Sequence, residues 1–334
     1  MEKRIWVAGF VAVLFCGLMT AGPVSGAEVQ KYIMGSGPMG GPWRIGVGAG
    51  VQLINEQLKD KYFFTAAASG GSVENVRRLM SGEYHTAWAH LSNMYDSWNG
   101  VGLFEGQKPY KEMRVLEYIT DQALCVVTLA KSPIRNFSEL VGKRVNLGPA
   151  GSGWVPISKE IFKALGLTDK IKANYLNFES AAQSLKDGQL DATINPGGPY
   201  ITPAVLEISR SVPVRLVEPT PEEAKKIETA IPYLHLAFIP ANKAPGENAE
   251  RDRKAFFGSM YWVAQAGMPE QVVYDILKST QEPKNKELLG KVLNYWVTAG
   301  PDFSGMVKVG IPIHAGAVKF WKEKGAKLPA ELVK

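Results

Sequence analysis

The sequence contains few of the residues that build disulfides or metal sites. Its 334 residues include two cysteines and four histidines. Cys16 lies in the N-terminal apolar segment, so Cys125 is the one cysteine beyond it, and a single thiol cannot form an internal disulfide. The histidines form no i,i+4 pair, HExxH motif or Cys/His cluster. We therefore expect no disulfide and no metal site, and we expect Cys125, in an apolar run, to be a buried, inert thiol.

Long hydrophobic runs are absent beyond the N-terminus. There, two basic residues precede an apolar run at 5–19, and small residues follow up to Ala27. The run is short for a membrane span. Phe15, just before Cys16, also occupies a position where a lipoprotein signal has a small residue. We expect residues 1–27 to be a signal peptide, cleaved near Ala27 to release the mature protein into a bacterial periplasm.

Catalytic motifs are also scarce. The chain has no Gly-x-Ser-x-Gly elbow, since the Gly-Ser-Gly at 151–153 has the wrong spacing. The loop at 35–40 matches the Gly-x-Gly-x-x-Gly dinucleotide fingerprint. However, the second expected strand ends in Ala68-Ser69-Gly70, without the acid that would bind a ribose, and Glu56 lies inside the first helix. We expect a non-enzymatic protein with no cofactor.

Clustered charge is absent as well. The formal net charge is +6, but the basic residues are spread along the chain. Nucleic-acid binding needs a basic stripe, so we expect no nucleic-acid partner. The small positive excess favours anionic small molecules.

The chain does contain a short element that occurs twice. Residues 79–88 (LMSGEYHTAW) and 185–194 (LKDGQLDATI) align without a gap. Each copy closes a helix, turns at a glycine, which is the usual left-handed cap, and enters an apolar strand. Two copies amid alternating strand and helix patterns predict two similar α/β lobes with a ligand cleft between them. We expect His85 and Asp191, equivalent in the two copies, to make structural hydrogen bonds at the strand starts.

No Gly/Ser-rich or charged linker separates the lobes, so we expect strands to act as hinges, near 126–130 and 233–239. The first lobe is expected at 28–125 and the second at 126–232. The chain then returns to the first lobe, with C-terminal helices, at 233–334.

Three glycine-rich loops, at 35–41, 69–72 and 148–153, each follow an expected strand and open a helix. Glycines let a ligand approach the main chain, and a helix start offers free N–H donors and a partial positive charge. Ser72 and Ser92 are expected to cap the starts of two helices. The loops together favour a small carboxylate or other oxyanion, held from both lobes.

Four stretches carry a more specific pattern: the glycine loop at 35–41, the segment at 69–83, the segment at 140–153 and His-Ala-Gly-Ala within 311–317. Together they resemble TAXI-type solute receptors of tripartite ATP-independent periplasmic (TRAP) transporters. The resemblance implies a type II periplasmic binding fold, with two α/β lobes joined by hinge strands. It also implies delivery of a small carboxylate, such as glutamate, glutamine or 2-oxoglutarate, to an ion-driven membrane permease. We expect a monomer. A sensing receptor and a periplasmic enzyme using the same cleft stay as alternatives.

The chain departs from the family pattern at three places. His90-Leu91-Ser92 replaces a Gln-Ser-Asp-like segment, Trp43 a tyrosine and Trp154 a threonine. These changes remove a partner for an amino group and make the cleft more apolar. They favour an anion without an ammonium, with an apolar or aromatic part, although each tryptophan could instead pack within its own lobe. The expected ligand-binding residues are Ser36, Gly37, Met39, Trp43, Ser69, Gly70, Ser72, His90, Ser92, Ser152, Gly153, Trp154, Asn195 and Tyr200.

Overall fold

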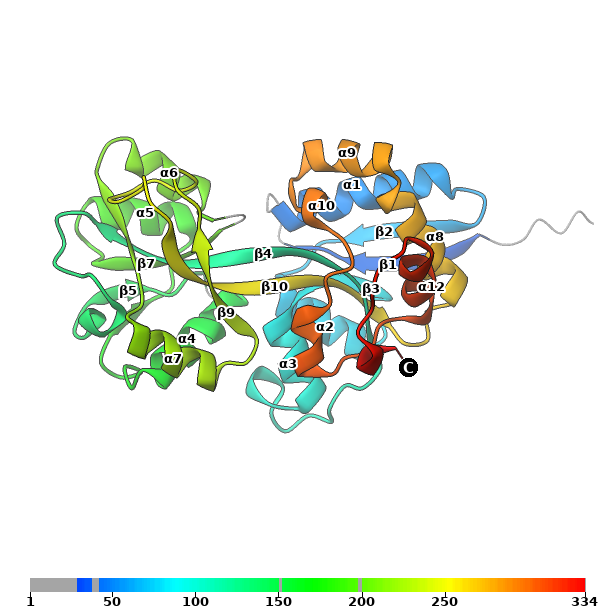
Figure 1. Cartoon of the computed structure of the whole chain (residues 1–334), viewed down its shortest axis with the longest axis horizontal. Helices are drawn as coiled ribbons and strands as arrows, with labels where there is room; N and C mark the ends of the chain where they lie inside the picture. The colour runs from blue at the N-terminus through cyan, green and yellow to red at the C-terminus, as the bar shows by residue number, and fades with distance from the viewer. Residues whose placement is uncertain (1–28, 38–41, 150–151, 198–199, 334) are drawn as a thin grey trace, which may run out of the picture.

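The structure, a computed structural model, describes residues 29–37, 42–149, 152–197 and 200–333. The expected signal peptide and Met39 lie outside these residues. Figure 1 shows two groups of helices and strands joined by the long strands β4 (Met113–Leu129) and β10 (Arg253–Gln265). Among the described residues, none of the helices has the length and apolar character needed to span a bilayer.

The first lobe is built on parallel strands that alternate with helices. β1 (Gln30–Gly35) pairs with both β2 (Tyr62–Ala67) and β3 (Thr86–His90). In Figure 1, α1 and α9 lie on one side of these strands, and α2 and α3 on the other. The helices of this lobe are α1 (Pro42–Gln57), α2 (Ser72–Met80), α3 (Leu91–Asn99), α8 (Glu270–Gln281), α9 (Pro283–Val292), α10 (Tyr295–Thr298), α11 (Ser304–Val309) and α12 (Ala315–Glu323), with the 3₁₀ turns η1 (Gly102–Phe104) and η3 (Ala330–Leu332).

The second lobe likewise combines strands with helices. Its strands are β5 (Arg144–Asn146), β6 (Lys172–Asn174), β7 (Ala192–Gly197), β8 (Val214–Val217) and β9 (Leu234–Ile239). Its helices are α4 (Trp154–Ala164), α5 (Phe178–Lys186), α6 (Pro203–Ser209) and α7 (Pro221–Ala230), with the 3₁₀ turn η2 (Phe137–Leu140). The strands of both lobes form one sheet in the order β2-β1-β3-β10-β4-β7-β5-β6, in which β8 also pairs with β4 and β9 with β10.

The chain returns to the first lobe later than the sequence suggested. β9 pairs antiparallel with the start of β10, between Arg253 and Gly258, so it lies with the second lobe. β10 then continues and pairs with β3 from Met260 to Ala264. The return crossing is therefore β10 rather than the expected strand at 233–239.

The twice-occurring element is a helix–turn–strand unit in both lobes, as expected. Gly82 follows α2 with φ of +81°, and Gly188 follows α5 with φ of +70°, which is left-handed backbone that favours glycine. The side chain of His85 accepts a hydrogen bond from the N–H of Ile33 (3.1 Å). In the other lobe, Asp191 accepts one from the N–H of Arg144 (2.7 Å). Both side chains thus tie a strand start to its neighbouring strand, which confirms their expected structural role.

Two clusters of buried apolar side chains stabilise the fold. The larger runs through the first lobe and continues into the second lobe, where it packs under α4 and α7. The smaller lies in the second lobe among β4, β8, α5 and α6. Cys125 is buried in the smaller cluster and donates through Sγ to the carbonyl of Tyr200 (3.0 Å). Burial raises the pKa of its thiol to about 12, so the expectation of an inert core thiol is confirmed.

Candidate ligand-binding site

The imidazole of His90 lies where the two lobes meet. β3 ends at this residue and α3 begins at the next. The ring lies between two tryptophans: its centroid is 4.9 Å from that of Trp43, in the first turn of α1, and 5.0 Å from that of Trp154, the first residue of α4. Trp43 and Trp154, one from each lobe, are therefore both adjacent to His90.

The main chain of the second lobe also lies close to His90, at Gly153. A Cβ placed on Gly153 would lie 3.2 Å from Oδ1 of Asn93, 3.6 Å from Cδ2 of His90 and 3.8 Å from Cβ of Ser72. Ser72 is the first residue of α2, and its Oγ accepts a hydrogen bond from the N–H of His90 (2.9 Å). The first turns of α1, α2, α3 and α4 thus converge on one point. Helix N-termini carry partial positive charge, so this arrangement favours a ligand with an anionic group.

Two of the expected helix caps are wrong. α2 begins at Ser72 with Gly71 in the cap position, so the hydroxyl of Ser72 binds His90 instead of its own helix. α3 begins at Leu91 with His90 in the cap position, which places Ser92 inside the helix. At α4 the cap position is Gly153, and Oγ of Ser152, an expected ligand-binding residue, accepts from the N–H of Trp154 (3.3 Å).

Three polar residues around the start of α3 carry buried atoms that have no hydrogen-bond partner among the described residues. Nδ1 of His90, Oγ of Ser92 and both amide atoms of Asn93 have no hydrogen-bond partner among the described residues. The exposed fractions of these three residues are 5%, 4% and 1%. An unsatisfied buried polar group costs roughly 1–3 kcal/mol. Polar atoms of this kind are expected where a ligand supplies the missing hydrogen bonds.

His90 is neutral in this environment. Burial lowers the pKa of its imidazole to about 3. One ring nitrogen is then a donor and the other an acceptor. The partial positive charge of the surrounding helix starts also disfavours an imidazolium. The ring can therefore give or accept a hydrogen bond at neutral pH without adding a charge to the site.

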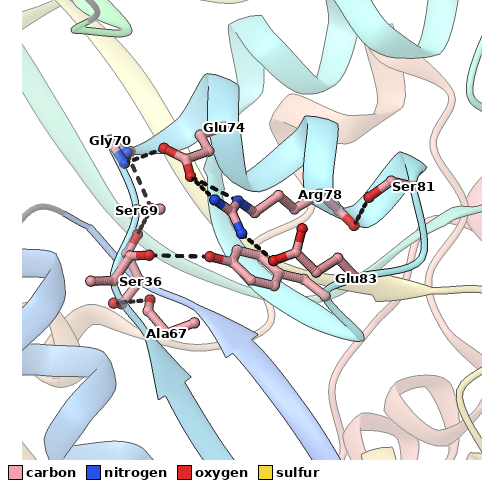
Figure 2. A network of polar contacts seen from close by, with 11 residues as sticks. Ser36, Ala67, Ser69, Gly70, Glu74, Arg78, Ser81 and Glu83 are labelled. Carbon is pink, nitrogen blue, oxygen red and sulfur yellow. Dashed lines mark hydrogen bonds and ion pairs between the residues drawn. The ribbon is translucent and has the colours of Figure 1, made fainter.

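The loop at 69–72 is held by its own side chains (Figure 2). The N–H of Gly70 donates to Glu74 (2.6 Å), and the N–H of Gly71 donates to Ser69 (3.2 Å). Glu74 also forms an ion pair with Arg78 (2.7 Å), and the Gly70 N–H is the main cause of its lowered pKa. The N–H of Gly70, an expected ligand donor, is therefore engaged by a carboxylate within the same loop.

A cation in the first turn of α1, just after the opening glycine loop, was not among the expected site residues. Nη1 of Arg44 donates to the carbonyl of Ala66 (2.5 Å) and lies 3.5 Å from Oγ of Ser36. Ser36 in turn donates to the carbonyl of Ala67 (2.5 Å), and Ser69 donates to the carbonyl of Ser36 (3.3 Å). The sequence did contain a signal for this cation, since Arg44 directly follows Trp43 at a helix start.

Two expected site residues make structural contacts within the second lobe. The amide of Asn195 is fully engaged with Thr202, to which it donates (2.8 Å) and from whose N–H it accepts (2.9 Å). Tyr200 packs edge-on against Phe257, with centroids 6.4 Å apart, beside the smaller core cluster. Both residues therefore help to fold the loop after β7. Gly37 stays with the site, since a Cβ on it would be 2.8 Å from Cβ of Trp43.

The histidine of the fourth family-like stretch has a structural role. His314 is the cap residue of α12, and its Nδ1 accepts from the N–H of Gly316 (3.2 Å). Its Nε2 lies 2.9 Å from the carbonyl of Met268. Within the described part of the chain, no group of three or more His, Cys, Asp or Glu side chains could hold a metal.

Comparisons with known proteins agree with this architecture. A TctC solute-binding protein from Polaromonas is similar over 90% of this chain and 99% of its own, with 14% identity and a TM-score of 0.50. The periplasmic aliphatic sulphonate binding protein SsuA from Escherichia coli is similar over 91% and 95%, with 14% identity and a TM-score of 0.48. The alkanesulfonate-binding SsuA from Xanthomonas axonopodis is similar over 92% and 97%, with 13% identity and a TM-score of 0.45.

The similarity to the TctC protein is one of fold, and it confirms the expected α/β fold of periplasmic binding proteins. A family model matches residues 34–325, which includes every described element from β1 to α12 except the first residues of β1. This chain is therefore a member of the NMT1-like family.

Proposed function

We propose that this chain is a periplasmic receptor that captures a small organic anion and delivers it to a TRAP-type permease in the inner membrane. The observation that carries the proposal is the convergence of four helix starts, from both lobes, on the buried polar cluster of His90, Ser92 and Asn93. Such a place is suited to holding an oxyanion, because the helix starts supply both donors and partial positive charge.

The TRAP assignment is supported by the sequence resemblance to TAXI-type receptors. The proteins of similar fold include sulphonate binders, so a sulfonate is a second candidate for the anionic group. A carboxylate is preferred because the resemblance to TAXI-type receptors implies one. A sensing receptor would bind the same solute, and a permease gene adjacent to the receptor gene would favour transport over sensing.

The proposal is tested by native mass spectrometry of protein purified from a periplasmic extract without denaturation. We expect part of the protein to carry the added mass of one small acid, which tandem fragmentation can identify. The protein can then be freed of solute by unfolding and refolding. Adding the identified acid to this solute-free protein should decrease the radius of gyration measured by solution scattering. Protein that never carries a solute, and is unaffected by panels of carboxylates and sulfonates, would contradict the proposal.

The Gly153→Val variant provides a matched structural test of the cleft. The new side chain would meet Asn93 and His90 only when the lobes approach, so co-purified solute should be lost. Gly267→Val is the control, because a Cβ at that position meets nothing within 4 Å.

A further inference from the structure

The amide of Asn93 is the most informative unpartnered group in the site. Its residue is 1% exposed, and neither Oδ1 nor Nδ2 has a hydrogen-bond partner among the described residues. It lies in the first turn of α3, and Gly153 of the other lobe approaches its Oδ1. A primary amide offers two donor hydrogens and one acceptor oxygen side by side.

A carboxylate can form a hydrogen bond with only one of the two amide atoms of Asn93. An ionised carboxyl accepts hydrogen bonds and donates none, so it would satisfy Nδ2 of Asn93 and leave Oδ1 unpaired and facing a negative charge. An ammonium would satisfy Oδ1 and leave Nδ2 unpaired. A carboxamide presents one donor and one acceptor in a single plane and pairs with both atoms at once.

The neighbouring side chains are also uncharged and can either donate or accept hydrogen bonds. Ser92 can donate and accept, and in neutral His90 the Nδ1 atom has no partner within the described parts of the chain. The nearest cation described above, Arg44, donates to the main chain of β2 and to Ser36. Nothing in this cluster neutralises a second ligand charge, and a charge buried without a partner is costly.

We propose that the bound solute is a short carboxylic acid whose other end is an uncharged carboxamide, and that Asn93 recognises this amide. The inference rests on the proposed function, in which the helix starts hold the acid's single negative charge. Asn93 is then the residue that separates monoamides from diacids. A diacid would be rejected because it leaves a buried amide atom of Asn93 without a hydrogen bond. Such an unpaired group discriminates between ligands more strongly than a small difference in apolar contact does.

Calorimetry with two matched pairs tests this: succinamate against succinate, and glutaramate against glutarate, at pH 7.5. For the mature protein we expect at least one monoamide to bind at least tenfold more tightly than its diacid. In Asn93→Leu, a substitution of similar size, the preference should fall below threefold. Asn99→Leu is the control, because Asn99 lies exposed at the other end of α3 and should keep the preference.

The possible failures are distinguishable. Diacids that bind as tightly as the monoamides, or a preference that survives in Asn93→Leu, would overturn the role of Asn93. If none of the four compounds binds at 10 mM while native mass spectrometry shows a co-purified acid, the receptor function stands and the amide class is wrong. If no solute is detected by either method, both proposals fail.

Discussion

Trp154 of the second lobe lies directly against Gly258 in the crossing strand β10: a Cβ on Gly258 would be 3.1 Å from Cη2 of the indole. The same indole contacts His90 of the first lobe. Trp154 therefore touches both the strand about which the lobes would turn and the residue at which they meet. Its surroundings must change whenever the lobes separate.

The first prediction concerns this tryptophan and Trp43. If both contact the solute, intrinsic fluorescence should change on binding, and replacing either by alanine should weaken binding by about 2 kcal/mol or more, as buried aromatic anchors do. Trp98→Ala is the control, because Trp98 lies on the outer part of α3 beneath Lys111. Normal affinity in both variants would mean that the two indoles pack against His90 without contacting the solute.

The second prediction is that lowering the pH favours lobe closure. Asp96 on α3 and Glu160 on α4 belong to different lobes, and the rings of Tyr95 and Tyr233 meet beside them at 5.7 Å. Burial raises the pKa of Asp96 to about 6. Burial, followed by repulsion from Asp96, raises the pKa of Glu160 to about 7, against a smaller opposing effect of Lys163.

Separating the lobes would rehydrate both carboxyls and return their pKa values toward normal. The closed form therefore binds more protons between about pH 4 and pH 7, so closure strengthens as the pH falls through this range. Solution scattering of solute-free protein should show a radius of gyration that decreases from pH 8 to pH 5. Asp96→Asn should flatten this dependence, whereas Asp187→Asn, at an exposed position, should not. A radius independent of pH in the parent protein would rule the effect out.

The third prediction concerns Glu117, buried between β4 and the C-terminal helices. Burial raises the pKa of this carboxyl to about 8, although Lys286 and the hydrogen bond from Gln281 lower it. The folded protein therefore holds a proton that the unfolded chain releases near its ordinary value of 4.5. The free energy of unfolding should fall as pH rises from about 4.5 to 8, by up to about 1.4 kcal/mol per pH unit.

Glu117→Gln removes the titration while keeping the shape of the side chain, so urea unfolding of this variant should lose that part of the slope. Glu105→Gln, at an exposed position, should keep it. An unchanged slope in Glu117→Gln would show that the carboxyl is already ionised in the folded protein.

A fourth prediction separates stability from binding. His314→Ala removes the cap of α12 and the contact with Met268, and loss of a helix cap typically costs about 1 kcal/mol. The melting temperature should therefore fall while solute binding is retained. Weaker binding with an unchanged melting temperature would assign the histidine to the site instead.

Local patterns predicted much of the fold. The turns at Gly82 and Gly188 were visible because a left-handed residue after a helix leaves a clear signal in the sequence. The crossing strand β10 was missed because residues 253–265 form a largely apolar run. Such a run in a fully buried strand shows no alternation and resembles a buried helix.

The candidate site was predicted less completely, because part of it depends on contacts that only the folded structure shows. Trp43 and Trp154 drew attention as departures from a family pattern, and their positions after glycine loops placed them near the cleft. Asn93 carried no such signal, because its importance comes from the absence of partners in three dimensions. Asn195 looked equivalent in sequence, but both of its amide atoms are used by Thr202.

The position of β10 between β3 and β4 also determines when each lobe can fold. The first lobe's sheet stays in two separate pieces until Arg253–Gln265 has been made, whereas most of the second lobe is complete earlier in the chain. Pairing between such distant segments is slow because the loop must close before the contacts form. Until then β3 and β4 expose unpaired edges, which are sites of aggregation. Chains shortened before Arg253 should therefore be captured by chaperones and proteases rather than accumulate as a folded second lobe.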